Sequence, residues 1–119
     1  NARALQIKAY VPVQDFALSR AFYRDLGFAE DGATGELACF SRDGAAFPLQ
    51  NFHVSEHTAN FRMHLLVDDV DAWWRSIEGS RLIERYLVRA EPPEDRPWGM
   101  RDFVLFDPSG VLWRISQSL

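Results

Sequence analysis

The sequence predicts an α+β domain built from two tandem copies of one strand–helix–strands unit. Segments 10–28 and 64–79 each place an apolar strand before an aspartate, an amphipathic helix and a glycine. Because such an echo reflects a repeated supersecondary unit, the chain is expected to fold as a doubled structure. A length of 119 residues suits one domain, with a first unit at about 1–52, a linker at about 53–60 and a second unit at about 61–119.

The first unit begins with a strand predicted over residues 5–13, where apolar residues alternate at the period of two that marks one face of a sheet. Asp15 is placed to cap the following helix, because its carboxylate can accept a free N–H of the first turn. Gly27 suits the left-handed position that ends a helix. Strands are then predicted at 36–41 and 46–52, joined by a turn that contains Asp-Gly.

The second unit repeats this order. Met63, Leu65 and Val67 alternate in a strand, Asp68 or Asp69 caps the helix, and Gly79 ends it. Further strands are predicted at 82–89, 102–106 and 111–116, the last two joined by a turn at 107–110. Residues 90–99 contain prolines that cannot donate to a sheet ladder, so this segment is predicted to be a surface loop rather than a helix or central strand.

Composition narrows the function. The formal net charge of −4 argues against a general affinity for nucleic acid or acidic membranes. The single cysteine, Cys39, excludes an internal disulfide and fits a cytoplasmic protein, and its strand position predicts a small core residue. No apolar run has the length of a membrane span, and the N-terminal residues lack the pattern of a signal peptide.

Two groups of residues then resemble a known family. They are Val11-Pro12-Val13, Ala21-Phe22-Tyr23 and Leu26-Gly27-Phe28 in the first half, and Arg96-Pro97-Trp98-Gly99, Phe103 and Asp107-Pro108-Ser109-Gly110 in the second. The chain resembles the glyoxalase/bleomycin-resistance/dioxygenase superfamily, also called vicinal oxygen chelate, and is most similar to its bleomycin-resistance branch. The resemblance implies two βαβββ modules that form a cup-shaped mixed β-sheet and a homodimer with two drug-binding clefts. Pro12 stands where that branch exchanges its N-terminal strand between subunits.

Enzymes of this superfamily hold a divalent metal at equivalent strand positions of the two modules. The resemblance places three of these positions at Lys8, Arg62 and Arg114, and a fourth near 48–50. Cationic side chains offer no lone pair to a metal, so we expect no metal, no cofactor and no catalytic residue of the usual kind. His53 and His57 lie in the predicted linker, without a helical pattern to set them side by side.

Strand parity and the resemblance together indicate the side chains that line the cleft. Aromatic rings there would stack on a planar ligand, and polar groups would orient it. The predicted ligand-binding residues are Tyr10, Phe40, Gln50, Asn51, Arg62, His64, Trp98, Gly99 and Arg114. Phe47 and Phe52 are expected in the core instead.

The leading hypothesis is a non-catalytic protein that sequesters a small molecule, either a glycopeptide antibiotic or an aromatic acid. Arg62 and Arg114 favour an anion unless Glu36, Glu94, Asp95 or Asp102 neutralises them. Three alternatives stay open. The chain could be a superfamily enzyme with displaced metal ligands, a regulatory module whose cleft is filled by side chains, or a binding protein in which both arginines only fill the former metal pocket.

Overall fold

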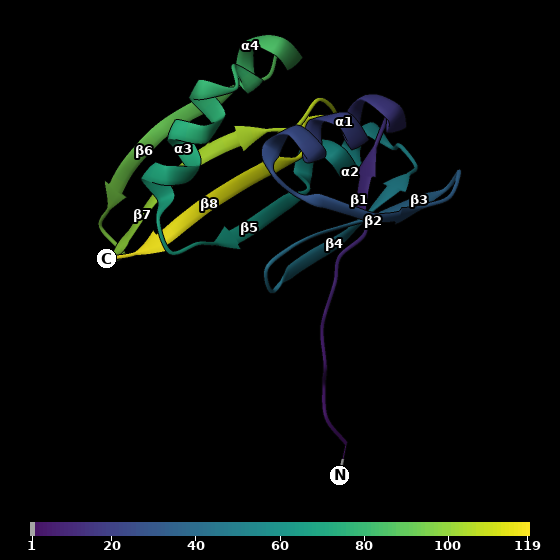
Figure 1. Cartoon of the computed structure of the whole chain (residues 1–119), viewed down its shortest axis with the longest axis horizontal. Coiled ribbons are helices and arrows are strands. Elements are labelled where there is room, and N and C mark those ends of the chain that lie inside the picture. Colours follow the sequence, from purple (N-terminus) through teal and green to yellow (C-terminus); the bar gives the residue numbers. More distant parts are fainter. Residues whose placement is uncertain (1) are drawn as a thin grey trace.

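The computed structural model describes residues 2–119, which form two four-stranded mixed sheets with helices beside them (Figure 1). In the first sheet the order β1-β4-β3-β2 joins β1 (Val11–Val13), β4 (Ala45–Asn51), β3 (Leu37–Arg42) and β2 (Ala29–Ala33). In the second, β5-β8-β7-β6 joins β5 (Arg62–Leu66), β8 (Leu112–Ser118), β7 (Met100–Phe106) and β6 (Ala90–Arg96). The helices are α1 (Phe16–Leu26), α2 (Ser55–Asn60), α3 (Val70–Gly79) and α4 (Leu82–Tyr86). The predicted α+β fold is confirmed.

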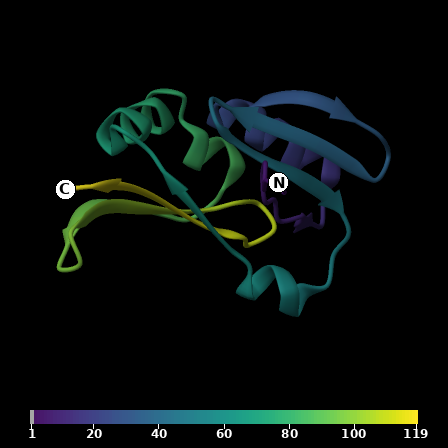
Figure 2. The ribbon, with the colours of Figure 1, turned by 90° about the horizontal axis from the view of Figure 1, so that it is seen from below.

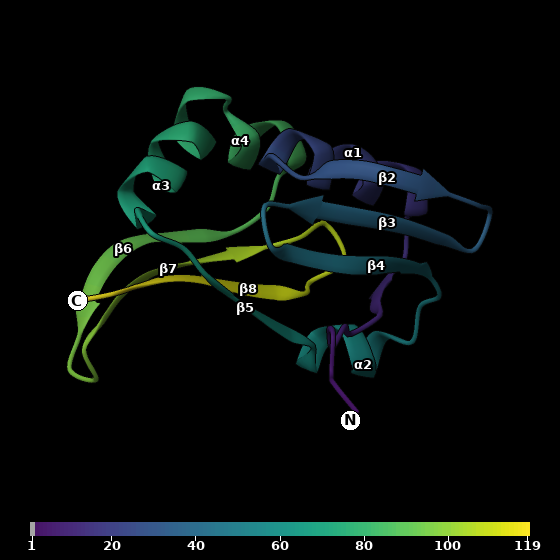
Figure 3. The same cartoon turned by 60° about the horizontal axis from the view of Figure 1, so that its bottom comes forward.

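The two sheets repeat one topology. β1 runs parallel to β4 and β5 runs parallel to β8, whereas the remaining neighbours are antiparallel. Helices α1 and α3 lie on the same side of the two sheets (Figure 3). Asp15 accepts the Leu18 N–H at 3.0 Å, and Asp69 rather than Asp68 caps α3 by accepting the Ala72 N–H at 3.1 Å. Gly27 follows α1 with a φ of 123°, as the sequence predicts.

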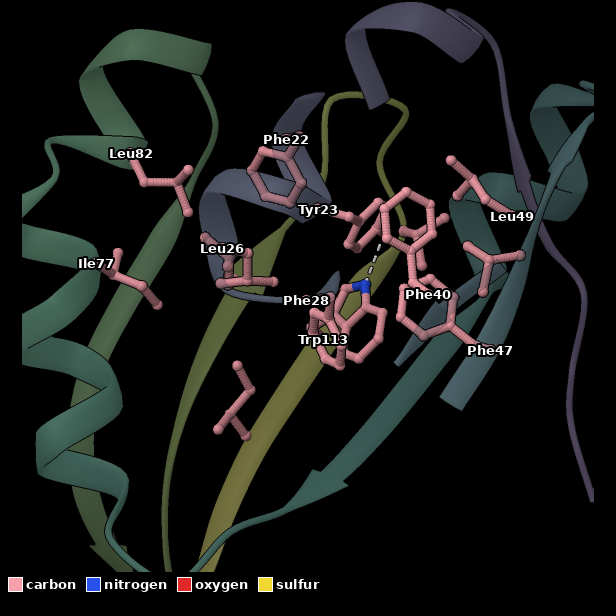
Figure 4. Packing of buried hydrophobic residues seen from close by; sticks show 14 of the residues in the cluster. Phe22, Tyr23, Leu26, Phe28, Phe40, Phe47, Leu49, Ile77, Leu82 and Trp113 are labelled. Atoms are coloured by element: carbon pink, nitrogen blue, oxygen red, sulfur yellow. Dashed lines mark hydrogen bonds between the residues drawn. The ribbon is translucent and has the colours of Figure 1, made fainter. Parts of the chain in front are cut away.

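Aromatic side chains join the two units in one core (Figure 4). Trp113 of β8 packs at ring-centroid distances of 5.6 Å from Tyr23 and 5.2 Å from Phe47, both in the first unit. The Trp113 Nε1–H donates to the Tyr23 hydroxyl at 2.8 Å, and this hydroxyl donates to Asp107 Oδ2 at 2.6 Å. Burial raises the pKa of both Tyr23 and Asp107, which favours the neutral tyrosine that makes this bond. The β7–β8 turn is thereby tied to α1.

The N-terminal strand is much shorter than the predicted 5–13. Only Val11–Val13 pair with β4, and residues 2–10 are exposed (Figure 1). The chain trace leaves the body of the domain on the N-terminal side of β1. In one copy of the chain, the alternating apolar residues before Val11 therefore contact no hydrophobic core. A strand pattern gives a strand only when the segment pairs with a sheet edge, which residues 2–10 do not do in one copy.

Two predictions after α3 were wrong. Residues 82–86 form the short helix α4 instead of a strand, because Leu82, Ile83 and Tyr86 also fit a helical period and turn to the core. Residues 90–96 form β6 instead of a loop. The prolines 92 and 93 are accommodated because β6 is an edge strand whose register shifts between Glu91 and Glu94.

Three smaller differences complete the fold. The segment 53–60 contains α2, so a helix stands where no helical pattern was recognised. β2 was not predicted, because its sequence Ala-Glu-Asp-Gly-Ala lacks apolar alternation. Cys39 is exposed rather than buried, because the opposite face of β3 is the one that turns to the core. None of the helices in residues 2–119 combines the length and apolarity needed to cross a lipid bilayer.

Candidate functional site

Each sheet has one face covered by α1 or α3 and an opposite face that neither of these helices covers, which we call the open face (Figure 3). On the second sheet the register identifies this face. Met63 pairs with Trp113 on the core side, so the alternate pair, His64 with Arg114, stands on the open face. The same alternation places on it Arg62, Leu66, Glu91, Glu94, Arg96, Met100, Asp102, Val104, Phe106, Leu112, Ser116 and Ser118.

A buried carboxylate organises this face. Asp102 is 0% exposed, and its Oδ1 accepts from Arg96 Nε and from Arg114 Nη1, both at 3.0 Å. Arg96 also donates to Glu94 at 3.0 Å. Asp102 and Glu94 are thus the two acidic candidates that neutralise cations here. The role of Arg96 was not predicted, because residues 90–99 were expected to form a loop. In a loop, the spacing of Glu94 and Arg96 does not indicate that their side chains share one face of a sheet.

The cationic residues at three of the expected metal-ligand positions do not fit a divalent metal. Arg62 is exposed on β5, Arg114 is ion-paired to Asp102, and Lys8 lies in the exposed segment before β1. Guanidinium and ammonium groups supply no lone pair, so this donor set would repel a divalent cation rather than bind it. Within residues 2–119, no cluster of three His, Cys, Asp or Glu side chains has the arrangement of a metal site.

On the first sheet, some predicted site residues lie elsewhere. Phe40 is 1% exposed and stacks on Phe47 at 5.7 Å on the helix side, so it belongs to the core and not to the open face. Asn51 shares that parity and donates to the Gly35 carbonyl at 3.0 Å. The period of two separates two faces, but it does not say which face α1 covers. Phe47 is in the core as expected, whereas Phe52 is 48% exposed.

Gln50 does lie on the open face of the first sheet, where it pairs in register with Pro12. With Tyr10, which is 58% exposed, it lines a hollow of about 600 Å³ beside α2. His57 lines the same hollow, and His53 lines a different one next to the β7–β8 turn. The two histidines therefore do not share a site.

Trp98 and Gly99 form the β6–β7 turn, at the end of the second sheet where the C-terminus also lies (Figure 1). Gly99 has a φ of 82°, and its carbonyl accepts the Leu119 N–H at 2.9 Å. The Trp98 side chain is 64% exposed. One chain therefore brings Arg62, His64 and Arg114 together, but it leaves Trp98 far from Tyr10 at the base of the N-terminal segment.

Between the two units, sheet edges are left unpaired. β5 is the edge strand of the second sheet, and β4 pairs with β1 only from Leu49 onward (Figure 2). A hollow of about 270 Å³ at these edges is lined by the apolar side chains of Phe28, Phe47, Met63, Leu65 and Trp113. Residues 6–9 border this hollow, yet Ile7 is 96% exposed and does not fill it.

The fold is similar to that of several bleomycin-resistance and antibiotic-binding proteins of known structure. The bleomycin resistance determinant encoded on transposon Tn5 matches with a TM-score of 0.82 and 23% identity, over 97% of this chain and 98% of that one. A bleomycin-binding protein crystallised with bleomycin matches at 0.81 and 23%, over 98% and 100%. TnmS3, an antibiotic-binding protein from Streptomyces sp. CB03234, matches at 0.71 and 27%, over 99% and 100%. No curated protein sequence matches the chain.

The family model described as Glyoxalase/Bleomycin resistance protein/Dioxygenase superfamily matches residues 5–115, which is nearly the whole chain. The doubled topology, the two open faces and this match agree with one another. The chain belongs to the glyoxalase/bleomycin resistance protein/dioxygenase superfamily.

Proposed function

We propose that the chain is a non-catalytic binding protein that sequesters a flat aromatic small molecule of the antibiotic type. The ligand would lie in a cleft between the open faces of two copies of the chain. The observation that carries the proposal is the exposed Trp98 at the end of an open face whose metal-ligand positions are cationic. A planar ring offers stacking area to a ligand, whereas the charged positions offer no Lewis-acid chemistry.

The similarity to TnmS3 and to the bleomycin-binding proteins supports the same class of ligand, since those proteins are described as binding antibiotics. Tyr10 and Gln50 would supply the half of the cleft that comes from the first sheet. Trp98, Gly99, Arg62, His64 and Arg114 would supply the half that comes from the second sheet of the other copy. Phe40 and Asn51 are no longer included, because neither faces this region.

Calorimetric titration with bleomycin-type glycopeptides and with a panel of flat aromatic compounds tests this function. We expect one ligand bound per chain and an affinity that falls about tenfold in Trp98→Ala, because a stacking surface is lost. Trp98→Phe should retain affinity within about threefold, and Leu87→Ala, at an exposed position of the α4–β6 connection, should have no effect. Absence of binding by every compound in both groups would contradict the proposed function.

The dimer is part of this proposal, and the hollow of about 270 Å³ at the edges of β4 and β5 supports it. In one copy, Leu5 and Ile7 are 89% and 96% exposed, while an apolar hollow lies open at the edges of β4 and β5. Insertion of the partner's N-terminal segment would bury these apolar residues and pair the free edge of β4. The parallel register that sets Val11 opposite Leu49 would then continue to set Ile7 opposite Ala45.

A disulfide trap tests strand exchange. The variant Ile7→Cys/Ala45→Cys, made with Cys39→Ser, places two cysteines on neighbouring parallel strands, within the Cα separation that a disulfide spans. Exchange predicts a covalent dimer of twice 13.7 kDa under non-reducing electrophoresis. A covalently closed monomer would instead show that the segment pairs within its own chain. Ile7→Asp should weaken the dimer at least 100-fold in light scattering, because two apolar side chains are lost from symmetric contacts.

A further inference from the structure

The open face of the second sheet has as many arginines as carboxylates in a chain that is acidic overall. The formal net charge of the whole chain is −4. Within residues 2–119, the charged members of this face are three arginines and three carboxylates, with His64 beside them. The charged residues are Arg62, Arg96, Arg114, Glu91, Glu94 and Asp102. The charge that a ligand meets on this face therefore depends on which of these groups are paired with one another.

Two of the three carboxylates are committed to two of the arginines, and the third, Glu91, is exposed on the edge strand β6. Asp102 accepts from Arg96 and Arg114 through one oxygen, Oδ1, and Glu94 accepts from Arg96. The second oxygen, Oδ2, is buried without a hydrogen-bond partner, so a ligand on this face cannot reach it. Asp102 thus fixes the position of the Arg114 guanidinium from its buried side. The Arg114 side chain is still 36% exposed and has further N–H groups to donate.

Arg62 has no such partner. Among residues 2–119, no acceptor lies within hydrogen-bond or ion-pair distance of its guanidinium, although eight ion-pair contacts form elsewhere. Arg62 and His64 are alternate residues of β5, so their side chains emerge on the same face about 7 Å apart. His64 stands opposite Arg114 in register. The three side chains form one group, with Leu66, Leu112 and Val104 as apolar neighbours.

We propose that the ligand of this site carries a carboxylate on its aromatic framework. Arg62 and Arg114 bind the carboxylate, His64 lies between them, and the apolar neighbours receive the ring. Asp102 is a positioning residue, because it acts on the ligand only by orienting Arg114. A ligand bearing a positive charge at this point would meet the unneutralised Arg62 instead. This inference rests on the proposed function and adds the charge class of the ligand to it.

Calorimetry with 2-naphthoate and its neutral isostere 2-naphthamide tests the proposal. We expect wild type to bind the acid at least tenfold more tightly than the amide, because a charge-assisted hydrogen bond is stronger than a neutral one. Arg62→Gln should weaken the acid about tenfold and leave the amide within twofold. Arg75→Gln, an exposed arginine of α3 on the helix side, is the matched control and should change neither. The preference for the acid should shrink as the salt concentration rises.

The outcomes separate this inference from the proposed function. Equal binding of acid and amide, or equal behaviour of Arg62→Gln and Arg75→Gln, would overturn the carboxylate assignment. Binding of a glycopeptide without binding of either naphthalene compound would overturn it as well and leave the proposed function standing. If neither naphthalene compound, no glycopeptide and no other aromatic compound binds, the proposed function itself fails. Thermal unfolding of each variant confirms that the compared proteins are folded.

Discussion

Replacement of Trp113 by alanine is expected to lower the free energy of unfolding by about 3–5 kcal/mol, which is the usual cost of deleting a buried tryptophan. Trp113 is 2% exposed, and it belongs to the second unit while its ring packs against Tyr23, Phe28 and Phe47 of the first. Its removal leaves a cavity where the two units meet. The Tyr23 hydroxyl also loses the hydrogen bond from the indole N–H.

Urea unfolding followed by far-UV circular dichroism measures this loss without relying on tryptophan fluorescence. Trp98→Ala deletes the same side chain from a position that is 64% exposed, so it is the matched control and should cost less than about 0.5 kcal/mol. A domain of this size is stable by about 5–15 kcal/mol, so Trp113→Ala should lose a substantial fraction of its stability. A loss below about 1 kcal/mol would show that the units do not depend on this contact.

Asp102→Asn is expected to lower the free energy of unfolding by about 2–4 kcal/mol. The substitution keeps the shape of the side chain but removes the charge that faces Arg96 and Arg114. Two guanidinium groups then share one region with no buried counter-charge between them. Both arginines are partly exposed, at 22% and 36%, so they can turn toward water and recover part of the loss.

Asp95→Asn is the matched control for Asp102→Asn. Asp95 also pairs with an arginine, Arg101, but its side chain is 65% exposed, so its loss should cost less than about 0.5 kcal/mol. Adding Arg114→Gln to Asp102→Asn should restore part of the stability, because it removes one of the unneutralised charges. The double-mutant cycle at urea midpoints measures that coupling. Additive effects of the two substitutions would contradict the arrangement around Asp102.

The features that follow from local pattern were predictable. Asp15 and Gly27 bound α1 because a carboxylate cap and a left-handed glycine act within one helical turn. Gly110 has a φ of 96° in the predicted β7–β8 turn for a similar reason. The doubled topology followed from the repeat of this pattern. The cationic residues at the metal positions could also be recognised from the sequence, because a residue's chemistry is independent of its partners.

What depended on distant partners could not be predicted in the same way. The segment 82–86 is a helix because its apolar residues meet the core from that side, and its short apolar run fits both periods. β6 tolerates prolines because only one of its edges is paired. Phe40 turned out to be in the core because α1 covers its face of the first sheet.

By itself, the sequence determined the α+β class, the repeat, the helix caps and the tight turns, and it placed cationic side chains at three of the positions where the family resemblance implies metal ligands. Each of these depends on residues a few positions apart or on side-chain chemistry alone. Only the tertiary structure decided that Asp102 neutralises Arg96 and Arg114 while Arg62 is left without a partner. Only it showed that the segment before Val11 stays unpaired in one copy, beside a free edge of β4. Both outcomes depend on which strands become neighbours, and strand neighbours are chosen by packing across the whole chain.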